Sequence, residues 1–148
     1  MNDKKEKTRI VENFLRKYHT YKVNIINCER QLSYLFPNVT ASFESDPSNG
    51  NAFKVSTTEK FAIDRIESKR ALDLHEQIAM SKMIVESIDS ALAVLTAQEQ
   101  TFVDLRYFQG MSFYEIADAM KASERSIFDL RIRLANKLAI SLSNLLAL

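Results

Sequence analysis

The sequence predicts an all-α protein in which two long N-terminal helices precede a compact helix-turn-helix domain. Apolar residues recur at helical spacing over most of the 148 residues, and only 2 glycines and 2 prolines interrupt them. The segment 95–142 also contains three helix starts separated by short turns. We expect a long-helix region for dimerisation or interaction at residues 1–94, with a loop at 37–57, and a helix-turn-helix domain, whose DNA-binding role is argued from its residues below, at residues 95–148.

The composition is that of a soluble protein with a packed core. Apolar residues make up 46% of the chain and charged residues 26%. No apolar run approaches the roughly 20 residues that span a bilayer, and no apolar stretch of a signal peptide follows the charged N-terminus. The single cysteine, Cys28, fits a reducing compartment. We therefore expect a cytoplasmic protein without membrane contact.

The first long helix is expected from Lys7 to Phe36. Its apolar residues alternate at spacings of three and four, which is the seam of a coiled coil. The seam residues are Val11, Phe14, Tyr18, Tyr21, Ile25, Cys28, Leu32 and Leu35. Such a seam needs a partner helix, since it would otherwise be exposed to water.

Pro37 is expected to end this helix, because the residue before a proline avoids the α region. The segment 37–57 contains both prolines and the turn sequence Asp46–Gly50, so we expect a linker there. Val39–Phe43 and Ala52–Val55 could pair across this turn as a short hairpin.

The second long helix is expected at about Glu59 to Val94, with Thr57 or Thr58 as its N-cap. Its C-terminal half carries a second seam, formed by Leu74, Ile78, Ser81, Val85, Ile88, Leu92 and Leu95. The two seams can pair within one chain as an antiparallel hairpin, or each can pair with the same seam of a second copy. The sequence leaves both arrangements open.

Three helices are expected in the segment 95–142. The first two each begin with a capping box, formed by Thr96 with Glu99 and by Ser112 with Glu115. Gly110 stands where the first helix needs a left-handed residue to end it. Ser123 can cap the third helix. Short turns between such helices are typical of a helix-turn-helix.

The third helix has two distinct faces. The inner face is formed by Ile127, Leu130, Leu134 and Leu138. The outer face consists of Arg125, Phe128, Asp129, Ile132 and Asn136, with Glu124 and Arg133 on its flanks. Apolar side chains can touch thymine methyl groups, an arginine can bind guanine, and carboxylates can accept from cytosine. We favour DNA contact for this face; packing of Phe128 and Ile132 on another helix or across a dimer is the alternative.

Further polar residues complete the expected DNA interface. Ser112 with the start of the second helix, Lys121, Arg133 and Lys137 are candidate phosphate contacts. The predicted DNA-binding residues are Ser112, Lys121, Ser123, Glu124, Arg125, Phe128, Asp129 and Arg133. We also expect a modest ion pair between Glu115 and Arg131.

The charge is unevenly distributed. Residues 1–36 carry 8 Lys or Arg against 4 Asp or Glu, residues 37–95 carry 6 against 9, and residues 96–148 carry 6 against 6. Neutrality of the helix-turn-helix segment argues against strong DNA affinity, because phosphate neutralisation supplies most non-specific binding. The basic N-terminal helix could supplement it.

Neither histidine has the neighbours of a catalytic or metal site. His19 and His75 fall on separate helices without metal-ligand spacing. The chain also lacks a phosphate-binding loop and a dinucleotide fingerprint. We therefore expect no enzymatic activity, no metal and no cofactor.

The segment from Leu95 to Ile127 resembles region 4 of the sigma-70 family. The resemblance is carried by Leu95, Thr96, Glu99, the run Leu105–Phe108, Gly110, Ser112, Glu115–Ala117 and Ser123. At Phe128 and Asp129 the chain departs from sigma factors, which usually have Lys or Arg there. The aromatic at Phe128, the later leucines, the chain length and the helical N-terminal half are more similar to ArpU/RinA-type phage late-transcription regulators.

This resemblance implies an activator of phage or prophage late genes in the cytoplasm of a bacterial host. It implies double-stranded promoter DNA as the partner, with RNA polymerase as a further one, and the long helices would form a homodimer. The alternative is a sigma-like interaction module that docks on RNA polymerase or another transcription factor without strong DNA binding of its own.

Overall fold

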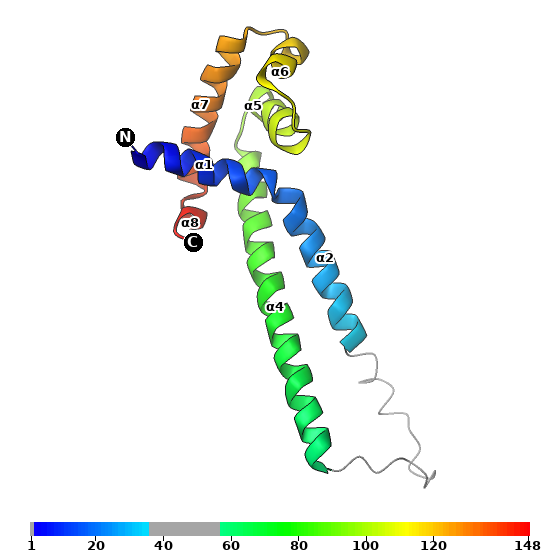
Figure 1. Cartoon of the computed structure of the whole chain (residues 1–148). Helices are drawn as coiled ribbons and strands as arrows, with labels where there is room; N and C mark the ends of the chain where they lie inside the picture. The colour runs from blue at the N-terminus through cyan, green and yellow to red at the C-terminus, as the bar shows by residue number, and fades with distance from the viewer. Residues whose placement is uncertain (1, 36–56) are drawn as a thin grey trace. The chain divides into compact units, whose positions relative to one another are not determined.

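The computed structural model describes residues 2–35 and 57–148 (Figure 1). Its helices are α1 (Asn2–Arg16), α2 (Tyr18–Leu35), α4 (Thr57–Ala93), α5 (Ala97–Val103), the π-helix η1 (Asp104–Phe108), α6 (Phe113–Met120), α7 (Glu124–Ser141) and α8 (Ser143–Leu146). These ranges contain no strand, so the all-α prediction is confirmed. None of the helices there combines the length and apolarity needed to cross a membrane. The expected hairpin of Val39–Phe43 with Ala52–Val55 lies outside the described residues.

The chain divides into two compact units. The first unit contains Met1–Lys22 and Lys82–Leu148, and the second contains Val23–Ser81. These limits do not coincide with the boundary expected between residues 94 and 95. Two segments from the predicted long-helix region, one at each end of it, belong to the same compact unit as the helix-turn-helix.

The prediction of a single helix from Lys7 to Phe36 is wrong. The observed helix begins earlier, at Asn2, and is interrupted at Lys17. Backbone hydrogen bonds still bracket the interruption: the amide of Lys17 donates to the carbonyl of Asn13 at 3.1 Å. The physical reason lies in burial. Leu15, which is not on the predicted seam, is 1% exposed, whereas the seam residue Phe14 is only partly buried. The two helices therefore bury differently spaced residues, and one straight seam cannot serve both.

The second unit is an antiparallel pairing of α2 with α4. Asn24 donates its side-chain amide to the hydroxyl of Ser81 at 2.9 Å, and Cys28 lies opposite Gln77. Cys28, Leu74 and Ile78 form the buried core, against which Ile25, Leu32 and Leu35 pack. The predicted seams thus meet within one chain, and Cys28 serves as a small buried hydrophobe.

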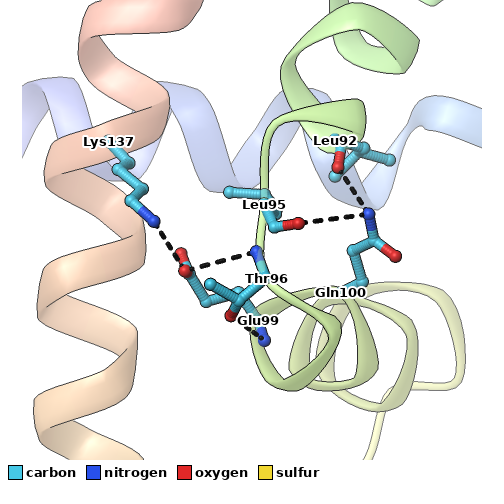
Figure 2. A network of polar contacts seen from close by, with 6 residues as sticks. All are labelled: Leu92, Leu95, Thr96, Glu99, Gln100 and Lys137. Carbon is cyan, nitrogen blue, oxygen red and sulfur yellow. Dashed lines mark hydrogen bonds and ion pairs between the residues drawn. The ribbon is translucent and has the colours of Figure 1, made fainter.

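The later part of α4 belongs to the first unit. The predicted seam is buried there at Val85 and Ile88, with Ile88 fully inaccessible, and its last residue, Leu95, is buried just after the helix. The helix ends at Ala93, and Gln100 donates hydrogen bonds both to its last turn and to the segment that follows it. The side chain of Gln100 donates to the carbonyl of Leu92 at 2.9 Å and to that of Leu95 at 3.4 Å (Figure 2). This clamp fixes the corner between α4 and α5.

Helix α1 packs into the first unit against α7, η1 and α8. Its apolar contacts come from Val11 and Leu15, each 1% exposed. At the opposite end of the chain, Leu142 and Leu145 are also buried, so the short α8 folds back onto the unit. The core of the helix-turn-helix unit therefore includes both ends of the described chain.

Truncation of α1 at its buried face tests this packing. We expect Leu15→Ala to lower the free energy of unfolding by about 2–5 kcal/mol, since it removes a buried side chain and leaves a cavity. Urea titration followed by circular dichroism measures the change. Ile140→Ala is the control within the same unit, because Ile140 is 79% exposed, and it should change stability by less than about 0.5 kcal/mol. Equal effects would show that α1 does not belong to the folded core.

Candidate nucleic-acid interface

Three N-terminal caps mark where the helices of the helix-turn-helix begin. The hydroxyl of Thr96 accepts from the amide of Glu99 at 3.2 Å, and that of Ser112 accepts from the amide of Glu115 at 3.2 Å. Each glutamate returns to the amide of its cap residue, so both predicted capping boxes are confirmed. Ser123 caps α7 as predicted, accepting from the amide of Ser126 at 3.1 Å. These local bonds fix where each helix begins.

Two left-handed residues end the first two helices. Gly110 has φ +73 after η1, as predicted, and no atom other than its own and those of its two chain neighbours lies within 4 Å of the place where a Cβ would stand. Glycine is therefore favoured there by backbone conformation rather than by lack of space. Lys121 occupies the turn between α6 and α7 with φ 52 and ψ 46, a conformation that an L-residue adopts at a cost.

The π-helix η1 directs three consecutive side chains to three different helices. Arg106 donates to the carbonyl of Met111 at 2.8 Å and lies 4.3 Å from the ring centre of Phe113, in α6. The Tyr107 hydroxyl donates to Glu12, in α1. Phe108 stacks on Tyr18, the first residue of α2, at 5.2 Å between ring centres. The sequence gives no sign of this role, because an ordinary helical period does not predict the wider π turn.

Glu12 is the polar centre of the unit. Its Oε1 accepts from the Tyr107 hydroxyl at 2.9 Å and from Arg131 Nε at 2.7 Å. Burial would raise the pKa of Glu12, but the hydrogen bonds from Arg131 and Tyr107 outweigh it and hold the pKa below its ordinary value. Arg131 therefore pairs with Glu12 and not with Glu115 as expected, because α1 packs beside α7.

A second ion pair joins α5 to α7. Lys137 Nζ donates to Oε1 of the buried Glu99 at 2.6 Å, and the same oxygen accepts from the amide of Thr96 at 3.4 Å (Figure 2). Burial alone would raise the pKa of Glu99, but these hydrogen bonds lower it overall. Lys137, expected as a phosphate contact, thus has a partner within the protein.

The two faces of α7 are separated as predicted. The inner-face residues Ile127, Leu130, Leu134 and Leu138 are all buried. On the outer side, Arg125 and Arg133 are exposed and form no ion pair with any residue that the structure describes. The remaining predicted DNA-binding residues that are also exposed are Ser112, Lys121, Ser123, Glu124 and Asp129.

Phe128 is both exposed and packed. It stacks on Phe113 with 4.4 Å between ring centres, although 44% of its surface stays accessible. The Phe113 ring also contacts the guanidinium of Arg106, so α6, α7 and η1 meet there. Packing on another helix, the alternative to DNA contact, therefore covers part of the Phe128 side chain, whereas Ile132 remains 52% exposed.

Residues 85–128 match the family model of sigma-70, region 4. The match covers less than a third of the chain, from the end of α4 to the first turns of α7, and so includes all three capped helix starts. No curated protein and no solved structure matches the chain. The match indicates a helix-turn-helix related to DNA binding and transcription.

Removing the Glu12 charge should change the pH dependence of stability. The folded-state pKa lies below the unfolded value of 4.5, so this group stabilises the fold above that pH and loses its contribution as pH falls through the folded pKa. We expect Glu12→Gln to cost about 1–3 kcal/mol at neutral pH, because Arg131 loses its charged acceptor. Chemical unfolding from pH 7 to 3 should show this difference shrink below about pH 4.5. A constant difference would contradict the assignment.

Substitution of the turn residue Lys121 tests whether its left-handed conformation costs stability. We expect Lys121→Gly to stabilise the protein by about 0.5–1 kcal/mol, since glycine relieves the left-handed strain but loses more entropy on folding. Thermal unfolding measures this effect. Lys121→Ala is the control, because it removes the same charge and keeps the strain; it should not be stabilising.

Proposed function

We propose that this chain is a sequence-specific DNA-binding transcription regulator. The observation that carries the proposal is the match of residues 85–128 to sigma-70, region 4, which falls on a capped helix-turn-helix with an exposed, polar outer face on its third helix. In helix-turn-helix proteins the second helix of the motif enters the major groove by its N-terminal residues. Helix α7 is the corresponding helix here.

The exposed groups of α7 and its turn suit two kinds of contact. Arg125, in the first turn, has no partner among the described residues and could bind guanine in the major groove. Glu124 and Asp129 could accept from cytosine N4. Lys121 and the exposed Ser112 stand at helix ends, where contacts to phosphate are common.

The regulatory role follows from the resemblance to phage late-transcription regulators. We propose an activator of phage or prophage late genes that acts in the bacterial cytoplasm. A homodimer suits a weakly charged module, because two sites joined on one duplex gain by effective concentration.

A second candidate function is docking on RNA polymerase or another transcription factor. It is favoured by the net charge of zero over residues 96–148 and by exposed apolar side chains on this module, including Tyr114 at 72% and Ile132 at 52%. Such side chains are typical of protein contacts.

Selection from a pool of randomised duplexes tests the first proposal. The wild-type chain should enrich a defined sequence, and Arg125→Ala should weaken binding to it by about 1–3 kcal/mol, roughly 5- to 150-fold, and relax one base position. Fluorescence anisotropy at fixed salt measures the affinities.

Arg70→Ala is the matched control, since Arg70 is an exposed arginine of α4 in the second unit. It should retain the specific affinity and an unchanged enriched sequence. Absence of any enriched sequence, together with co-purification of RNA polymerase, would replace the first proposal by the second.

A further inference from the structure

A groove of about 1000 Å³ lies between α1 and α7 in the first unit. Figure 1 shows α1 crossing α7 there. Helix α1 contributes Lys4, Lys5, Thr8, Arg9 and Glu12, and α7 contributes Arg131, Ile132, Ala135 and Asn136. Most of the exposed lining of the groove is apolar, and Lys4, Lys5 and Arg9 on the α1 side add positive charge to it.

Three of the four positively charged side chains that line this groove have no ion-pair partner among the described residues. Lys4, Lys5 and Arg9 are exposed and form no ion pair with any described residue. Glu12, the carboxylate in the lining, is already matched by Arg131 at 2.7 Å. Lys7, by contrast, pairs with Asp3 at 2.8 Å and does not line the groove. Three cations thus remain available for an anionic ligand.

The groove continues the outer face of α7. Ile132 and Asn136 line it, and the same two residues continue the helical stripe that begins at Arg125 and Phe128. The surface proposed to contact bases and the groove are therefore neighbouring parts of one helix face.

We propose that this groove binds the DNA phosphate backbone beside the bases that α7 contacts. The inference rests on the proposed function and adds a source of affinity to it. Phosphate neutralisation dominates DNA affinity, yet residues 96–148 have no net charge and spend Lys137 and Arg131 on internal ion pairs. Helix α1 supplies the missing cations from a distant part of the sequence.

Salt titration of DNA binding tests the groove. The probe is a random-sequence duplex, and the full-length chain is compared with Lys4→Gln/Lys5→Gln. Each lost phosphate contact should reduce the slope of log K against log salt by about 0.9. We expect a slope smaller by about 2 and binding weaker by about tenfold or more at low salt. Adding Arg9→Gln should remove one further phosphate contact and reduce the slope by about 0.9 more.

Lys7→Gln/Lys17→Gln is the control with the same net-charge change. Lys7 is ion-paired and Lys17 lies in the turn after α1, and neither lines the groove. The control should leave the slope nearly unchanged. Equal reductions in both double variants would overturn the groove proposal, because they would reflect net charge alone.

Two further results separate this proposal from the function beneath it. If Arg125→Ala loses specific binding while Lys4→Gln/Lys5→Gln keeps the wild-type slope, the groove proposal fails and the function stands. If the wild-type chain binds no duplex, both fail. Loss of poly-glutamate binding in Lys4→Gln/Lys5→Gln, with DNA binding unchanged, would assign the groove to an acidic protein segment and overturn the proposal.

Discussion

The carboxylate of Glu12 is the constraint on which the rest of the helix-turn-helix unit depends. It is buried, and one oxygen accepts from both Tyr107 and Arg131. A buried carboxylate is stable only when it is paired and hydrogen-bonded. This pairing places α1, η1 and α7 in fixed relation within the unit. The orientation of α7 is therefore set by a residue near the other end of the chain.

This arrangement gives the π-helix a structural purpose. The side chains of Arg106, Tyr107 and Phe108 in this π turn contact different partners, two of which lie in α1 and α2. The helix-turn-helix is consequently not a separate C-terminal module. Its compact unit also contains α1 and the later part of α4, both of which precede it in sequence.

The same packing explains the electrostatic character of the surface. Arg131 and Lys137 neutralise buried carboxylates, and Arg106 lies over an aromatic ring. Three cations of residues 96–148 are exposed and form no ion pair within the described part of the chain: Lys121, Arg125 and Arg133. The helix-turn-helix thus uses several of its basic residues for internal contacts, whereas Lys4 and Lys5 of α1, beside α7, form no ion pair with any residue that the structure describes.

The sequence by itself determined the features that depend on near neighbours. The caps at Thr96, Ser112 and Ser123, the left-handed Gly110 and the buried seam of α4 all follow from residues within a few positions of one another. Only the tertiary structure decided the interruption at Lys17 and the partner of Arg131, which is 119 residues away from it. A helical period identifies a buried face but does not specify what covers it, and an ion pair between distant segments leaves no local pattern. The fold class was therefore predictable, whereas the inclusion of α1 in the helix-turn-helix unit was not.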